Sequence, residues 1–98
     1  MLFRSQAEVL YDVGSLLWEM GKPAEAFPYL ERAAQVCPTD AGILVQLALA
    51  LAERREFAAA KDRLTAAKRL DPGDRRIDQA ISELALQQRS GGRRRKAA

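Results

Sequence analysis

The sequence predicts an all-α protein made of two repeated helical hairpins and a capping helix. Apolar residues recur at spacings of three and four along most of the chain, which is the period of an amphipathic helix. Pro and Gly interrupt this pattern, and no β-branched or aromatic run alternates for long enough to indicate a strand. Many residues also recur after 34 positions, which indicates a helical repeat, or α-solenoid.

The first hairpin is expected to begin at a capping box. In Ser5-Gln6-Ala7-Glu8 the Ser can accept from the backbone N–H three residues on, and the Glu can reach back. The apolar stripe that follows ends at Gly21-Lys22-Pro23, which places Pro near the first position of a helix over residues 23–37. Pro28 lies inside that second helix and removes one backbone hydrogen bond, so we expect a bend near Ala24.

The second hairpin is expected to begin at Asp40, as the cap of a helix over residues 41–54. This helix is apolar nearly all round, which is typical of a central helix. Two repeats bury a small core, so we also expect a monomer to leave apolar faces of this helix open for self-association. A fourth helix runs from Phe57 to Leu70. Asp74 then caps a fifth helix, over residues 75–89, which Ser90-Gly91-Gly92 should end.

The 34-residue interval relates both expected caps and six further pairs of residues: Pro38 and Pro72, Ala26 and Ala60, Leu30 and Leu64, Ala33 and Ala67, Leu10 and Leu44, and Leu17 and Leu51. Small residues at fixed places allow two antiparallel helices to approach to about 8–9 Å, and the larger Leu side chains fill the gaps. We therefore expect the four repeated Ala residues to be buried where helices cross.

This pattern resembles the tetratricopeptide repeat family, whose unit is a helix–turn–helix of 34 residues. Gly14 and Ala48 match the small close-packing place, and Gly21 matches the turn. Arg55 stands where the turn Gly is common, so we expect that turn to differ. The resemblance implies repeats at about 7–40 and 41–74 and a capping helix at about 75–89, within one domain over residues 1–90. Residues 91–98 have no apolar face to bury, so we expect them to form a disordered basic tail.

The composition argues against several classes of function. With no His and one Cys, the chain lacks a His general base, the usual zinc ligand sets and an intrachain disulfide. No Gly-rich phosphate loop is present either, so we expect neither an enzyme nor a bound cofactor or metal. The single Cys37 fits a reducing compartment, and we expect a cytoplasmic protein.

No membrane segment is expected. Residues 1–20 include four charged side chains and so contain no signal-peptide core, and the longest uncharged stretch, Ala41–Ala52, has twelve residues. A membrane-spanning helix needs about 20.

Charge is distributed unevenly along the chain. Residues 89–98 hold five basic side chains and no acid, whereas residues 1–88 hold eleven basic and thirteen acidic side chains. The run Arg93-Arg94-Arg95-Lys96 can attract phosphate nonspecifically, but no aromatic residue is interleaved for base stacking. A role as a nucleic-acid accessory is therefore the weaker alternative.

The family resemblance implies noncovalent recognition of a peptide or helix in a concave groove lined by the first helix of each repeat. The matching candidates here are Glu8, Tyr11, Asp12, Ser15, Trp18, Glu19, Val45, Gln46, Leu49, Glu53 and Arg76. Together with Glu83 they set five acids against one base around four apolar anchors. We therefore expect a scaffold or chaperone-like adaptor that binds an apolar segment of another protein carrying Lys or Arg. The alternative of another class is a structural homo-oligomerisation unit.

Overall fold

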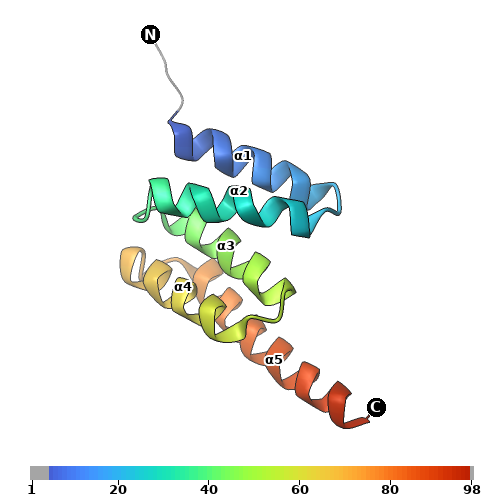
Figure 1. The fold of residues 1–98 in the computed structure, drawn as a ribbon. Helices are drawn as coiled ribbons and strands as arrows, with labels where there is room; N and C mark the ends of the chain where they lie inside the picture. Colours follow the sequence, from blue (N-terminus) through green and yellow to red (C-terminus); the bar gives the residue numbers. More distant parts are fainter. Residues whose placement is uncertain (1–4, 98) are drawn as a thin grey trace.

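The structure, a computed structural model, describes the backbone of residues 5–97 and the side chains of residues 5–89. Its helices are α1 (Gln6–Glu19), α2 (Pro23–Val36), α3 (Ala41–Glu53), α4 (Phe57–Leu70) and α5 (Arg75–Ala97). α1 and α2 form one antiparallel hairpin, α3 and α4 form a second, and α5 packs against the second hairpin (Figure 1). The described residues contain no strand, so the predicted all-α class is confirmed.

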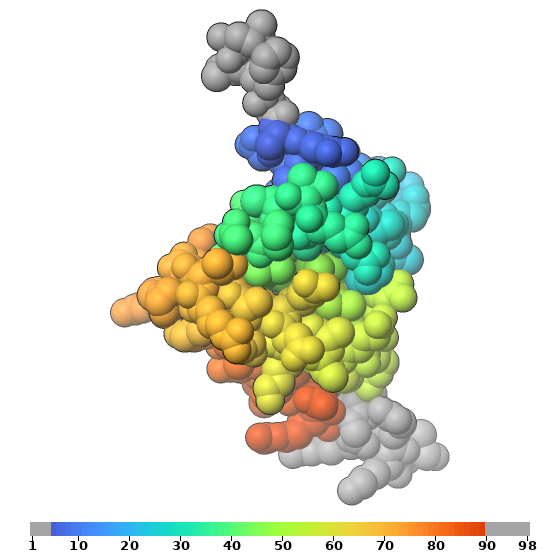
Figure 2. Space-filling view, turned by 60° about the vertical axis from the view of Figure 1, so that its left-hand side comes forward, coloured from blue at the N-terminus to red at the C-terminus, as the bar shows by residue number. Residues whose placement is uncertain are grey.

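Successive helices are neighbours along one elongated stack. α2 packs against α3 as well as against α1, and α5 packs against both α3 and α4. In the space-filling view the surface follows the order of the chain, from blue α1 through the adjoining surfaces of α2 and α4 to α5 (Figure 2). This order fits a helical repeat, in which each hairpin packs on the next.

α1 and α3 begin where the sequence predicts because side-chain caps satisfy one of their first backbone donors. The Glu8 backbone N–H donates to Ser5 Oγ at 3.1 Å, and the Ser5 N–H donates to Glu8 Oε1 at 3.2 Å, which completes the capping box. Pro23 is the first residue of α2. Asp40 Oδ1 accepts from the Ile43 backbone N–H at 3.2 Å at the start of α3.

The turns inside the two hairpins have the same conformation, so the expectation that the Arg55 turn differs is wrong. Gly21 has φ of 79° and Arg55, 34 positions later, has φ of 62°. The next residue of each turn donates its backbone N–H to an equivalent Leu carbonyl: Lys22 to Leu17 at 2.9 Å, and Glu56 to Leu51 at 2.9 Å. These bonds satisfy the same free carbonyl in each hairpin, so Arg55 takes the left-handed conformation that Gly adopts more easily.

The core is built on small residues at the helix crossings, as predicted. Ala26, Ala33, Ala60 and Ala67 have no exposed surface, and the larger side chains Leu30, Leu47, Leu64 and Ile77 are at most 2% exposed. At Gly14 the helices approach so closely that a Cβ atom would lie 2.9 Å from Leu30 Cγ. The counterpart Ala48 is 1% exposed, so both hairpins keep a small residue at this place.

α3 is the central helix, and the expectation that a monomer leaves its apolar faces open is wrong. Seven of its thirteen residues are buried, and Val45 and Leu49 are half-buried. α2, α4 and α5 all pack against it. The apolar character around α3 therefore serves contacts within the chain on several sides.

α5 is longer than the sequence predicts. Its backbone continues through Ser90-Gly91-Gly92, where an end is expected, and over most of the range expected to be a disordered tail. Two Gly residues weaken a helix by about 1 kcal/mol each relative to Ala, a cost that does not prevent helical geometry. Ala98 and the side chains of residues 90–98, including the basic run, lie outside the described residues.

Pro28 lies inside α2 with its side chain exposed. It has no N–H to donate to the Ala24 carbonyl, so α2 lacks one bond of its ladder. The predicted bend at this place stays a prediction.

Candidate functional site

Two pockets lie along one side of the molecule, and each is lined by residues of α1, α3 and α5. The larger, here called the Trp18 pocket, has a volume of about 680 Å³ and is lined by Trp18, Leu49, Ala52, Glu53, Arg55, Phe57, Glu83, Leu86 and Gln87. The smaller, here called the Tyr11 pocket, has a volume of about 300 Å³ and is lined by Tyr11, Ala41, Gly42, Val45, Gln46, Asp71, Asp74, Arg76 and Ile77.

The Trp18 pocket brings together three of the predicted site residues. Trp18 comes from the last turn of α1, and Leu49 and Glu53 lie one turn apart on α3. Trp18 is half-buried and contributes to the pocket wall, so it is not hidden beneath α2. Phe57 at the start of α4 and Leu86 on α5 add apolar surface opposite. The pocket is therefore apolar at several points of its wall, with carboxylates among them.

The Tyr11 pocket brings together four more predicted residues, namely Tyr11, Val45, Gln46 and Arg76. Tyr11, Val45 and Gln46 are half-buried. Val45 of this pocket and Leu49 of the other lie one helical turn apart on α3. The Tyr11 pocket lies beside the first half of α3 and the Trp18 pocket beside the second half. The surface that holds both pockets is here called the α1–α3–α5 face.

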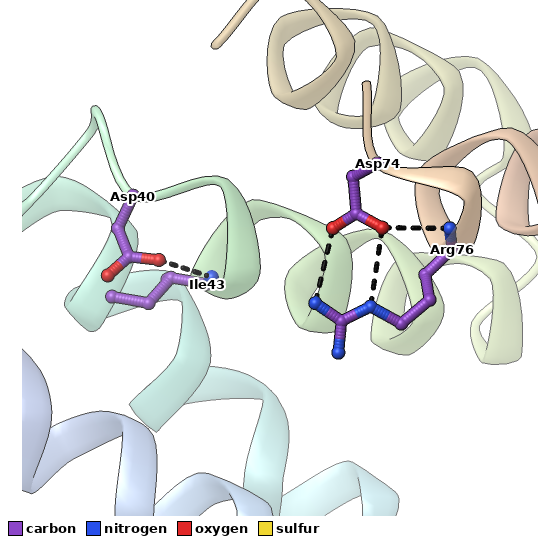
Figure 3. Close-up of polar contacts among 4 residues, drawn as sticks. All are labelled: Asp40, Ile43, Asp74 and Arg76. Carbon is purple, nitrogen blue, oxygen red and sulfur yellow. Dashed lines mark hydrogen bonds and ion pairs between the residues drawn. The ribbon is translucent and has the colours of Figure 1, made fainter. Parts of the chain in front are cut away.

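Arg76, on this face, is paired with the carboxylate of Asp74. Its guanidinium donates to Asp74, with Nη2 3.2 Å from Oδ2 and Nε 3.3 Å from Oδ1, and its backbone N–H donates to Oδ1 at 2.9 Å (Figure 3). The hydrogen bond from the Arg76 side chain lowers the pKa of the Asp74 carboxyl, and the same bond raises the pKa of Arg76. Asp74 therefore both caps α5, as predicted, and neutralises the one base among the predicted site residues.

Four predicted site residues line neither pocket: Glu8, Asp12, Ser15 and Glu19, all on α1. Glu8 is held in the capping box. Glu19 and Asp12 are exposed. Ser15 is half-buried, and its Oγ has no hydrogen-bond partner among the described residues. These residues share a side of α1 with Tyr11 and Trp18 by helical spacing, but the hollows form only where α3 and α5 supply opposite walls.

Several lining residues were not predicted from the sequence. Leu86 and Gln87 continue the Gln79–Glu83 side of α5 by one turn, so helical spacing carried further along the chain would have found them. Arg55 and Phe57 come from the turn and the start of α4, outside the helix faces that the family resemblance assigns to the groove. Asp71 and Asp74, which line the Tyr11 pocket, were not predicted either. Together the two pockets are lined by four acids, Glu53, Glu83, Asp71 and Asp74, and by two bases, Arg55 and Arg76, so the excess of acids is smaller than the predicted five to one.

The arrangement offers apolar contact and charge rather than ligands for a metal. Within the part of the chain that the structure describes, no three His, Cys, Asp or Glu residues gather as a metal site. None of the helices in that part is long and apolar enough to cross a bilayer.

Comparison with known proteins gives one finding about the family. A family model described as tetratricopeptide repeat matches residues 17–84, which is more than half of the chain. No curated protein matches the sequence.

Proposed function

Because the chain belongs to the tetratricopeptide repeat family, whose repeats generally mediate protein–protein interactions, we propose that it binds a segment of another protein on its α1–α3–α5 face. The observation that carries this proposal is the Trp18 pocket, where Trp18, Leu49, Phe57 and Leu86 line one hollow of about 680 Å³. Binding hot spots are enriched in Trp and cluster in well-packed, desolvated pockets, so Trp18 is the expected anchor and the neighbouring apolar side chains complete its recess.

The segment that fits best is apolar and carries Lys or Arg. Apolar groups of the partner would fill the Trp18 pocket, while Glu53 and Glu83 on its wall would attract the basic groups. The Tyr11 pocket extends the surface along α3, so an extended peptide or a helix could contact both hollows. The role of the complex, as a scaffold or a chaperone-like adaptor, and the cytoplasmic location remain predictions.

Selection from a display library of random peptides tests this function without knowledge of the partner. Selected peptides should combine apolar residues with Lys or Arg, and Leu86→Ala should weaken their binding. Leu86 is 59% exposed, so its loss should leave folding intact. Trp18→Ala should weaken binding further, by about 1–3 kcal/mol.

Leu70→Ala is the matched control, because Leu70 is an exposed Leu that lines neither pocket. Equal affinity of Leu86→Ala, Trp18→Ala and Leu70→Ala for the selected peptides, with unchanged helix content, would contradict the proposed face.

A further inference from the structure

A row of α1 is exposed at one end of the stack although it is apolar. It consists of Val9, Val13 and Leu16 with the C-cap residue Met20, spaced by three and four residues, and is here called the α1 end row. Val9, Leu16 and Met20 are 45%, 58% and 55% exposed, and Val13 is half-buried. The row lines neither pocket of the α1–α3–α5 face.

The repeat shows that this row is a packing surface. Its counterparts 34 residues later are Ile43, Leu47, Ala50 and Arg54. Ile43, Leu47 and Ala50 are at most 4% exposed. The Arg54 guanidinium lies 4.2 Å from the centre of the Phe27 ring of α2, so this row of α3 faces α2. α2 covers this row of α3, whereas no described residue covers the α1 end row.

The exposed apolar surface continues from α1 onto α2. Five of the seven large apolar side chains that are well exposed in the described part of the chain belong to the first hairpin, Tyr29 and Val36 of α2 among them. A hollow of about 440 Å³ lies between the two helices and is lined by Gln6, Leu10, Pro28, Tyr29 and Arg32. The end of the stack is therefore a broader apolar surface than one helix row, of a kind that marks an interaction site.

The opposite end of the stack does not offer an apolar surface that could cover this row. At the opposite end, the α5 counterparts of buried Leu44 and Ala48 are Asp78 and Ser82, and both are exposed. A head-to-tail stack of copies would thus place the apolar row against polar side chains.

We propose that the α1 end row packs against the same row of a second copy of the chain, which gives a symmetric dimer. Identical patches can cover each other around a two-fold axis, and the contact then closes at two copies. The row contains no charged residue, so like surfaces meet without burying a charge. The α1–α3–α5 face stays open in this dimer, so each copy could still bind its own partner segment.

Sedimentation equilibrium of the full chain tests the dimer over a range of concentrations. The wild-type mass should rise to that of two chains and no further, and Leu16→Gln should weaken the association about tenfold or more. Leu86→Gln is the matched control, because Leu86 is 59% exposed and Leu16 is 58% exposed. Val9→Gln gives a second test on the row, and helix content by circular dichroism confirms folding.

Three results would overturn the proposal: a monomer at every concentration, a mass that grows beyond two chains, or a dimer weakened by Leu86→Gln and not by Leu16→Gln. Peptide binding separates it from the proposed function, since Leu16→Gln should keep the affinity for a selected peptide and Leu86→Gln should lose it.

Discussion

At the scale of single residues, the two hairpin turns adopt the same backbone conformation although one has Gly and the other has Arg at the equivalent position. Gly21 and Arg55 both have positive φ, and both turns close on the same Leu carbonyl. A side chain in this region costs about 1–2 kcal/mol, so the second turn carries a strain that the first avoids. The Arg55 guanidinium lies 5.6 Å from the centre of the Phe57 ring, which offsets part of that cost.

Gly21→Ala should therefore destabilise the protein by about 1–2 kcal/mol through the backbone alone. A Cβ atom at this place would meet nothing within 4 Å, so no clash contributes. Gly73→Ala is the control, because Gly73 has equally open space and no positive φ. Urea denaturation of both variants measures the difference, and equal midpoints would contradict the argument.

Asp74 precedes α5, and its carboxylate pairs with the side chain of Arg76 in the first turn of that helix. Its pKa is lowered by the Arg76 hydrogen bond, so its ionised form is favoured in the folded state. The resulting stability is complete above the usual pKa of 3.8 and is lost as the pH falls through the lower folded value. Asp74→Asn should thus be less stable than the wild type at pH 7, and the gap should close in acid.

The measurement is the urea midpoint of both proteins at pH 7 and in acid below the folded pKa. Asp78→Asn serves for comparison, because Asp78 also lies in the first turn of α5 but pairs with Lys68 of α4, at 2.7 Å. A gap between wild type and Asp74→Asn that widens as the pH falls would contradict the assignment.

At the scale of elements, α2 differs from the other helices because it keeps a Pro in its interior. Pro23 starts the helix, where a missing N–H costs little, whereas Pro28 removes a bond to the Ala24 carbonyl. The Pro28 side chain is exposed, so no core contact compensates for the lost bond.

Pro28→Ala should stabilise the protein by about 1–3 kcal/mol, because the helix regains one hydrogen bond and loses the clash of the ring. Pro23→Ala should change little, since the first helical position needs no donor. Thermal melts of the two variants give the comparison. A lower melting temperature for Pro28→Ala would mean that the ring serves the protein in another way, such as contact at the hollow beside Tyr29.

At the scale of the whole molecule, the stack separates two surfaces by their chemistry. The α1–α3–α5 face combines half-buried aromatic residues with four acids and two bases, whereas the α1 end row is uncharged. A partner attracted by charge would therefore approach the former, and a neutral apolar contact suits the latter.

Charge reversal on the wall of the Trp18 pocket should slow the association of a basic peptide. Glu53→Lys with Glu83→Lys places two positive charges there, so the association rate should fall and depend less on salt. Glu19→Lys is the control, because Glu19 is an exposed acid that lines neither pocket. Stopped-flow measurements at several salt concentrations give the association rates. If Glu19→Lys slowed association as much as Glu53→Lys with Glu83→Lys, this steering role would be contradicted.

The sequence by itself determined the helices and their order, because these follow from local chemistry. The Ser5 and Asp40 caps, Pro23 and the spacing of apolar residues each act within a few turns of the chain, and the 34-residue interval shows that the same hairpin occurs twice. The buried Ala residues could also be predicted, since the repeat places small residues at both crossings. It did not predict how far α5 extends, because Gly weakens a helix without forbidding it.

Only the tertiary structure decided which parts of the helix surfaces become pockets. Trp18, Leu49 and Leu86 come from three helices, and Phe57 joins them because the Arg55 turn brings α4 alongside. Arg76 matched a binding position by spacing, but its charge is neutralised by a capping carboxylate two residues away. The α1 end row and three of its four α3 counterparts are apolar, and the presence or absence of a neighbouring helix decides that the former is exposed and the latter are buried. Burial depends on what packs opposite, and periodicity along one chain does not record that.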